Sequence, residues 1–265
     1  MIQKKKDLID VIAENYKPNI TEDNEKIFVV NRNRFNEALE RYKKSLAVKK
    51  PLLEERLVLT PSEINLLLQA SQEFQNRPEY VNITNIFITR LIQTSFEKGY
   101  NHFFLNLKNM NAPYCFASTL NGTRDRFLTI EVEGDIGPYG ASNIQYVEFT
   151  LRGNAEANYG NKAKQSCFYI YGDTERDCTS FIDDCIVVIH GSAESIGRES
   201  RNSIFKTNFK SNISKMKKDL PLGNDIYLIR AGQDEKKIIR VIEVLNNYYE
   251  IGKKCIQLLK NEKDR

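Results

Sequence analysis

A glycine recurs every 19 residues in the middle of this chain, and an alternating apolar segment leads into each one: Gly134, Gly153, Gly172 and Gly191. A fixed period near twenty residues is typical of stacked repeats, because one repeat cannot bury its apolar face alone. The sequence therefore predicts a solenoid of 19-residue coils. The period constrains the fold much more than it constrains a function.

Residues two, four and six places before each glycine share one face of a strand, because alternate side chains point the same way. They are Val132, Ile130 and Leu128, then Leu151, Phe149 and Val147, then Ile170, Phe168 and Ser166, then Ile189, Val187 and Cys185. Two further columns follow the glycines: Ile136, Ala155, Thr174 and Ala193, and Ile144, Ala163 and Ile182. We expect parallel strands about 4.8 Å apart, with each column stacked into a buried ladder.

The glycines are expected to end each strand at a corner, where a residue without Cβ turns without steric cost. The polar residue after each glycine should bond to nearby backbone; these residues are Asp135, Asn154, Asp173 and Ser192. A degraded fifth coil is expected at the same offset, with Lys210 in the glycine position and Ile204, Lys206 and Asn208 facing inward. Terminal repeats are atypical because they must end the stack.

The segment Gly134–Gly140, with a second glycine soon after the first, makes these coils resemble the GXGXG right-handed β-helix family. That domain closes the large subunit of glutamate synthase and occurs in the C subunit of formylmethanofuran dehydrogenase. The resemblance covers residues 125–230 and implies a right-handed parallel β-helix that is largely a scaffold, with no catalytic residue to carry over. The chain departs from the family pattern at Glu156, Glu175 and Glu194, which replace the second glycine in the later coils.

Residues 1–110 carry apolar side chains at helical spacing and predict a helical N-terminal region. The segment Thr60–Glu63 has the residues of a capping box with proline in the first turn. Asn33 is a candidate N-cap for the helix before it, and Thr84 for the helix after it, which Gly99 would end.

The predicted solenoid domain spans residues 111–230, and a strand at His102–Leu107 leads into it. Met216–Leu222 is predicted as a basic loop and Asp225–Ile229 as a strand. Residues 231–265 are predicted as a C-terminal region, whose amphipathic helix at about 235–260 packs on the solenoid. The predicted fold class is α+β: a helical region, a short right-handed parallel β-helix and a C-terminal helix.

The outward side chains change character along the stack, from Glu131, Glu133 and Glu148 in the early coils to Cys, Tyr, Ile and Val in the later ones. An apolar outward face needs a cover. We expect the terminal helices to pack on the later coils. If they leave that face open, it is a surface for a partner or for a second copy of the chain.

Composition narrows the function classes. The net charge of +4 is modest and does not identify a nucleic-acid protein. The five cysteines include no CxxC pair, which favours buried free thiols in a reducing compartment over disulfides or a metal site. The sequence carries no apolar core of a signal peptide and no membrane-spanning run, so we expect a cytoplasmic protein that does not bind a membrane. No cofactor is predicted.

Three groups of charged residues are candidate sites. Glu156, Glu175 and Glu194 share a column that could bind cations or a basic partner, but a solvated edge is the favoured interpretation. Outward carboxylates such as Glu131 and Glu148 could serve as acid and base on carbohydrate, but Arg152 above Glu133 favours an ordinary ion pair. The basic tract with Lys215, Lys217 and Lys218, like that at Lys4–Lys6, could contact nucleic acid or an acidic partner. A charged cap of the solenoid is the favoured interpretation.

No reactive centre assembles from these residues. The sequence therefore favours a non-catalytic solenoid scaffold or protein-interaction module, with a protein partner or a homo-oligomer. The alternative that the resemblance allows is a structural subunit of a larger redox or amidotransferase enzyme complex. A carbohydrate-acting β-helix and a nucleic-acid binder stay open as further hypotheses.

Overall fold

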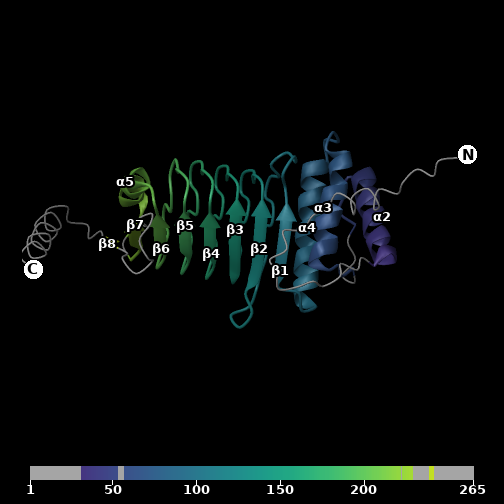
Figure 1. Cartoon of the computed structure of the whole chain (residues 1–265), viewed down its shortest axis with the longest axis horizontal. Coiled ribbons are helices and arrows are strands. Elements are labelled where there is room, and N and C mark those ends of the chain that lie inside the picture. The colour runs from purple at the N-terminus through teal and green to yellow at the C-terminus, as the bar shows by residue number, and fades with distance from the viewer. Residues whose placement is uncertain (1–30, 53–56, 222, 229–238, 242–265) are drawn as a thin grey trace, which may run out of the picture.

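The computed structural model describes residues 31–52, 57–221, 223–228 and 239–241. Within these residues the chain has the predicted α+β class, because helices come first and a parallel β-solenoid follows. The eight strands form one sheet in chain order, and the helices α2–α4 lie beyond its β1 end (Figure 1). The N-terminal helices therefore extend the stack lengthwise.

Three α-helices and a 3-10 turn make up the described N-terminal region. Their bounds are Arg32–Val48 (α2), Pro61–Ser71 (α3), Gln72–Phe74 (η1) and Tyr80–Glu97 (α4). Tyr42 of α2 packs edge-on against Phe87 of α4, with ring centroids 5.4 Å apart. The buried apolar cluster continues from these helices into the coils, from Phe35 to Ile226. Residues 1–30 of the predicted helical region lie outside the described residues.

The predicted capping box at the start of α3 is confirmed. The Thr60 hydroxyl accepts a hydrogen bond from Glu63 N, and Glu63 Oε2 accepts one from Thr60 N. Glu63 is buried, and its other oxygen accepts a hydrogen bond from Asn31 N at 2.8 Å. One carboxylate therefore joins the starts of α2 and α3.

Two other predicted helix caps are wrong. Asn33 lies inside α2, whose N-cap is Asn31. Thr84 lies inside α4, where its hydroxyl and that of Tyr42 form a buried hydrogen bond of 2.6 Å. This tertiary contact satisfies a threonine that the sequence alone assigns to a cap. Gly99 follows the end of α4 with a φ of +111°, as predicted for a glycine that ends a helix.

The strands of the sheet are short and evenly spaced. They are His102–Asn106 (β1), Leu128–Glu133 (β2), Val147–Arg152 (β3), Cys167–Ile170 (β4), Ile186–Ile189 (β5), Ile204–Thr207 (β6), Asp225–Leu228 (β7) and Ile239–Val241 (β8). The strands β1–β7 pair parallel, and β8 pairs antiparallel with β7. Val132, Leu151, Ile170 and Ile189 are register partners and are fully buried, so the predicted 19-residue stack is confirmed.

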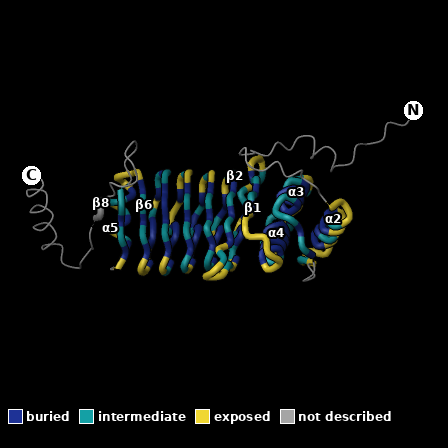
Figure 2. The backbone as a smooth tube through the Cα atoms, turned by 60° about the horizontal axis from the view of Figure 1, so that its bottom comes forward, coloured by how far each residue is buried: buried dark blue, intermediate teal, exposed yellow. Residues whose placement is uncertain are grey.

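The other predicted inward columns are also buried. Bridges link Ile136 to Ala155, Ala155 to Thr174 and Thr174 to Ala193. The second column, Ile144, Ala163 and Ile182, is at most 1% exposed. Buried and half-buried residues alternate along the strands, as expected when one face meets the core (Figure 2). Each coil therefore has more than one inward side.

The repeat glycines are required for a reason that differs from the predicted one. A Cβ on Gly172 would lie 2.3 Å from the carbonyl oxygen of Gly153, and one on Gly191 would lie 2.0 Å from that of Gly172. Of the four, Gly134 alone has a positive φ. Glycine is therefore required at positions 153, 172 and 191 because neighbouring coils approach too closely there for a Cβ.

The polar residue after each glycine bonds to the next coil. Asp135 Oδ1 accepts a hydrogen bond from Asn154 N at 2.7 Å, and Asn154 Oδ1 accepts one from Asp173 N at 2.9 Å. Asp173 Oδ1 continues the ladder to Ser192 N at 2.7 Å. The predicted bonds to nearby backbone are thus bonds between coils.

The predicted offset of the fifth coil is wrong. A bridge links Thr174 to Ala193, which are 19 residues apart, but the next links Cys178 to Ile196, which are 18 apart. One residue is therefore missing between Ala193 and Ile196. Because side chains alternate along a strand, a shift of one residue turns every later side chain to the opposite face.

The fifth coil is consequently filled by other residues than those predicted. Phe205 and Thr207 of β6 are fully buried beside Val187 and Ile189. The three residues predicted inward miss the core: Ile204 and Lys206 are half-buried and Asn208 is exposed. Lys210 is the first residue of a helix and does not end a strand.

Each coil also contains left-handed backbone that the sequence did not predict. In one coil φ is positive at Tyr139, Ala141, Asn143 and Tyr146, and the next coils repeat this at Asn158, Lys162 and Gln165, and at Asp177, Thr179, Phe181 and Asp184. Residues with Cβ adopt this region at a cost of about 1–2 kcal/mol each. Hydrogen bonds to both neighbouring coils hold them there: Ala141 N donates to Phe116 O and Asn143 N to Asn161 O, both at 2.8 Å.

Amide side chains close the N-terminal edge of the stack. Asn65 Oδ1 of α3 accepts a hydrogen bond from Asn106 N at 2.9 Å, and Gln69 Nε2 donates to Asn106 O. On α4, Gln93 donates to Asn121 O at 3.1 Å and accepts from Asn121 N at 2.9 Å. The helices therefore satisfy backbone groups of the first coil that no strand pairs.

The C-terminal edge is closed in the same way. The structure has a helix, α5 (Lys210–Asp219), where a basic loop was predicted from Met216 onward. Its buried Asn212 accepts a hydrogen bond from Ala193 N and donates one to Gly191 O, both at 3.0 Å. Asn224 accepts from Ser203 N at 3.0 Å. Two asparagines thus occupy the edge that a further coil would need.

The predicted strand at Asp225 is confirmed as β7, but the predicted C-terminal helix at about 235–260 is wrong over β8. Residues 239–241 extend the sheet antiparallel to β7. The rest of residues 231–265 lies outside the described residues, including the predicted packing of that region on the solenoid.

Candidate functional site

The outer face of the sheet is formed by the side chains of β1–β7 that point away from the core. Parallel register arranges them in columns that cross the strands. The first column is His102, Thr129, Glu148, Cys167, Ile186, Ile204 and Asp225, and the second is Phe104, Glu131, Thr150, Tyr169, Val188, Lys206 and Tyr227. A third contains Glu133 and Arg152, with Tyr171 and His190 at the corresponding places after β4 and β5.

A line of contacts crosses five coils of this face. His102 Nε2 lies 2.8 Å from Glu131 Oε1, and Glu131 Oε2 lies 3.9 Å from Arg152 Nη2. The Arg152 guanidinium lies 5.1 Å from the centroid of the Tyr171 ring, which stacks on His190 at 4.7 Å. The two histidines of the chain therefore stand at the two ends of one line.

Two of the three outward carboxylates on the early coils, Glu131 and Glu133, have basic partners. Glu133 pairs with Lys108 Nζ at 2.8 Å, and Glu131 pairs with His102 and Arg152. Arg152 is the register partner of Glu133, as predicted, but its ion pair is with Glu131. Carboxylates paired in this way lack the open acid and base that carbohydrate cleavage uses.

The later coils present an apolar patch on the same face. It comprises Cys167, Tyr169, Ile186, Val188 and Ile204; Val188 is 7% exposed and the others are half-buried. Tyr171 beside it is 47% exposed. The expectation that terminal helices cover these coils fails for the described helices, since α2–α4 lie beyond β1 and α5 beyond the other end (Figures 1 and 2).

The glutamate column has one half-buried member, Glu156, and two exposed members, Glu175 and Glu194. Glu156, Glu175 and Glu194 follow one another on successive coils. Burial raises the pKa of the Glu156 carboxyl, and the charges of Glu175 and Asp135 raise it further. In the described part of the chain no group of three His, Cys, Asp or Glu side chains has an arrangement that could hold a metal ion.

The predicted basic tract is divided by α5. Lys215 Nζ donates a hydrogen bond to Ala193 O and so helps to close the stack. Lys217 and Lys218 are exposed in the last turn of the helix, where lysine complements the helix dipole. Lys4–Lys6 lie outside the described residues. The structure therefore does not gather Lys215 with the other two into one open patch.

The described cysteines are all free. Cys178 and Cys185 are buried, and burial raises the pKa of each thiol to about 12. Cys115 and Cys167 are half-buried, and burial also raises their pKa. These thiols are poor nucleophiles at neutral pH. Cys255 lies outside the described residues.

A groove between α4 and the first coils was not predicted from the sequence. It has a volume of about 530 Å³ and no carboxylate among its lining residues. Tyr114 and Tyr139 form an edge-on pair on its wall, with ring centroids 5.6 Å apart, and Cys115 and Arg90 also line the groove. The exposed tyrosines alone could have suggested it, but they are distant from α4 in sequence.

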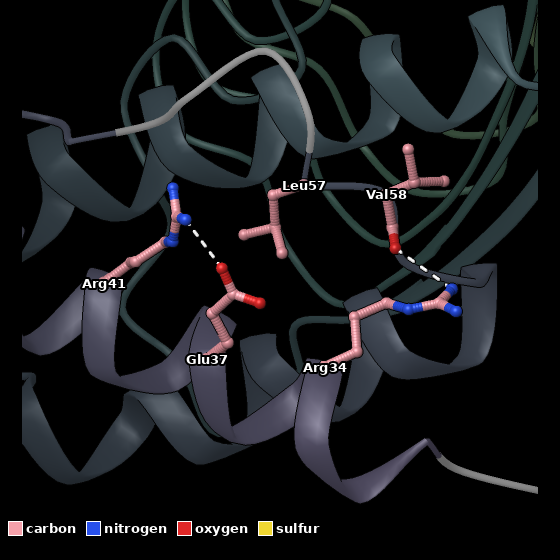
Figure 3. A pocket seen from close by; sticks show the side chains of 5 residues that line it. All are labelled: Arg34, Glu37, Arg41, Leu57 and Val58. Carbon is pink, nitrogen blue, oxygen red and sulfur yellow. Dashed lines mark hydrogen bonds and ion pairs between the residues drawn. The ribbon is translucent and has the colours of Figure 1, made fainter.

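A second hollow, of about 380 Å³, lies between α2 and the segment before α3 (Figure 3). Arg41 Nη2 pairs with Glu37 Oε1 at 2.6 Å across its wall, and Arg34 donates to Val58 O at 3.3 Å. Leu57 supplies the apolar part. The charged groups drawn in Figure 3 already have partners within the wall, so they do not converge on a ligand.

No known family model matches this sequence, and neither a curated protein nor a solved structure matches it. None of the helices in the described ranges is long and apolar enough to cross a membrane.

Proposed function

We propose that this chain is a non-catalytic β-solenoid module that binds a protein partner through the outer face of its sheet. The observation that carries the proposal is the apolar patch of Cys167, Tyr169, Ile186, Val188 and Ile204, which no described helix covers. Contiguous apolar surface on a soluble protein marks an interaction site. Its rim of Glu148, Arg152 and Lys206 resembles the polar rim of a protein interface.

The shape of the face supports the same proposal. Its side chains are fixed by the register of successive strands and by the line of contacts from His102 to His190. A surface that is already ordered loses little conformational freedom when a partner binds. Rigid sheets of this kind suit recognition more than chemistry, which also needs a reactive group with a shifted pKa and access to substrate.

The alternative is a structural subunit of a larger redox or amidotransferase enzyme complex. It is suggested by the resemblance to the GXGXG β-helix, which the repeat glycines carry: one coil approaches the next at Gly153, Gly172 and Gly191. Glu156 and its column partners depart from that family pattern. A scaffold in such a complex would use the same outer face, so the two proposals differ in the identity of the partner.

One affinity purification from the native cell tests the proposal. The tagged full chain is compared with Ile186→Glu, which places a carboxylate in the apolar patch, and with Val48→Glu. Val48 is an exposed apolar residue on α2, far from the face, and is the matched control. A stoichiometric partner that Ile186→Glu loses and Val48→Glu keeps supports the proposal, and an enzyme as that partner favours the alternative. Equal recovery with both variants contradicts docking on this face.

A further inference from the structure

We infer that the outer face pairs with the outer face of a second copy of this chain, about a two-fold axis that runs along β4. The inference depends on the proposed function, because it names the partner of the same face. It follows from how the charges and rings of the face are distributed about its central strand.

The strand β4 is the middle one of the seven parallel strands. Two sheets that pack face to face lie about 10 Å apart with their strands roughly aligned. An axis along β4 places β3 opposite β5 of the second copy, β2 opposite β6 and β1 opposite β7. Because this axis is parallel to the strands, each column of side chains faces the same column of the other copy.

The first consequence is an ion pair that occurs twice. Glu131 on β2 and Lys206 on β6 belong to the same column, and each lies two strands from β4. The distance from the axis is about 10 Å on either side, given a strand spacing of about 4.8 Å. Each glutamate therefore falls opposite the lysine of the other copy.

The outermost strands match in the same way. His102 on β1 falls opposite Asp225 on β7, and Phe104 falls opposite Tyr227. A histidine with a carboxylate and an aromatic ring with an aromatic ring are both favourable pairs across an interface. The acidic end of the face in one copy therefore lies opposite the basic end in the other copy, and the apolar middle parts lie opposite each other.

The centre of the pairing is apolar and aromatic. Cys167, Tyr169 and Tyr171 lie on or beside the axis and meet their own counterparts, while Val188 falls opposite Thr150. Tyrosine is enriched among the residues that contribute most of the binding free energy at the centre of a protein interface. Two facing pairs are not complementary and do not stabilise the dimer: Glu148 opposite Ile186, and Arg152 opposite His190.

Other arrangements of two copies are less favourable. An axis along the length of the stack would set Glu131 opposite Glu131 and Lys206 opposite Lys206, which repel. Association through the β1 end of the stack is disfavoured, because Asn65 already bonds to the backbone of β1 there. A self-complementary patch on a two-fold axis is the commonest form of homodimer.

Charge exchange between the two copies tests the inference. The full chain, Lys206→Glu, Glu131→Lys and an equimolar mixture of these two variants are measured by sedimentation velocity over a wide range of concentration. In a dimer of either variant both ion pairs become like-charge pairs. In the mixed dimer one pair is the natural one and the other is its exact reverse in sign, so both attract. Lys217→Glu, an exposed position on α5 outside the face, is the matched control.

We expect a dimer of the natural chain, association weakened at least tenfold in each single variant, and recovery in the mixture. Thermal unfolding of each variant alone establishes that it is folded. A natural chain that stays monomeric at every concentration overturns the inference, as does a mixture that associates no more tightly than its components, or a control weakened as much as Lys206→Glu. A monomeric chain whose partner is lost with Ile186→Glu overturns the homodimer while the proposed function stands.

Discussion

Glu148 and Cys167 are register partners on neighbouring coils, so a carboxylate and a thiol that are 19 residues apart in the chain stand side by side on the outer face. The pKa of the Cys167 thiol is raised, first by burial and then by the negative charge of Glu148. This pair connects the sequence period to a measurable property of one side chain.

Replacing Glu148 by Gln should lower the pKa of Cys167. A raised pKa means less thiolate at a given pH, so removal of the neighbouring charge should move the alkylation curve of this thiol to lower pH. Burial remains, so the pKa should stay above that of an unperturbed cysteine. Peptide-resolved iodoacetamide labelling across pH measures the shift. Glu175→Gln, on another side of the coil, should leave the curve unchanged, and equal curves for all three proteins would contradict the stacked register.

The substitution Gly172→Ala should destabilise the fold by roughly 2–3 kcal/mol, as expected when a tightly packed site receives an extra methyl group. The new Cβ would meet the carbonyl oxygen of Gly153 at 2.3 Å. Gly99→Ala is the comparison, because a Cβ there meets nothing within 4 Å but the φ is +111°. Its loss should be about 1 kcal/mol, from backbone strain alone. Urea unfolding measures the free energy of unfolding of both variants. A smaller decrease for Gly172→Ala than for Gly99→Ala would show that contact between coils is not the reason for the glycine.

Lys162 and Lys164 offer a matched pair of exposed lysines in one coil. Lys162 has a φ of 59°, whereas Lys164 is not among the residues of positive φ. Lys162→Gly should stabilise the protein by roughly 0.5–1 kcal/mol, because glycine adopts the left-handed region without a Cβ clash. Lys164→Gly should destabilise it by a similar amount, since glycine there only gains freedom in the unfolded chain. Equal losses in the free energy of unfolding would refute the left-handed coil backbone.

Asn212→Ala should open the C-terminal edge of the stack. It leaves Ala193 N and Gly191 O without their partners in a buried place, at about 1–3 kcal/mol for each unsatisfied group. An unpaired strand edge also invites pairing with other chains. Differential scanning calorimetry and light scattering should show a lower melting temperature and more aggregation, whereas Ser211→Ala, at its exposed neighbour, should change neither. A variant as stable and as dispersed as the natural chain would rule out this cap.

The parts of the fold that depend on periodic patterns were predictable. Four coils and their inward columns follow from the 19-residue period and from alternation along each strand. The capping box of Thr60 follows from residues that are adjacent in sequence. The fifth coil was mispredicted because the deletion between Ala193 and Ile196 leaves no mark in composition, and alternation then assigns Phe205 and Lys206 to the wrong faces.

Long-range contacts explain the other differences. Thr84 was assigned to a cap because its partner, Tyr42, is distant in sequence. The amides that close the edges, such as Asn65 and Gln93, look like ordinary helix-surface residues until the first coil is beside them. The outer face was predicted by alternation, but the two-fold match of Glu131 with Lys206 requires the corrected register of β6.

The most direct test of the stacked coils is a thiol bridge between neighbours on the outer face. In Glu148→Cys the Cα atom of the new cysteine should lie about 4.8 Å from the Cα atom of Cys167, within the range of a disulfide. In Thr150→Cys the distance between the two Cα atoms should be about 8 Å, beyond that range. Mild oxidation, or dibromobimane, which fluoresces when it joins two nearby thiols, should link the first variant within one chain and leave the second unlinked. Linking in the second variant and not in the first would contradict the parallel 19-residue stack on which the account depends.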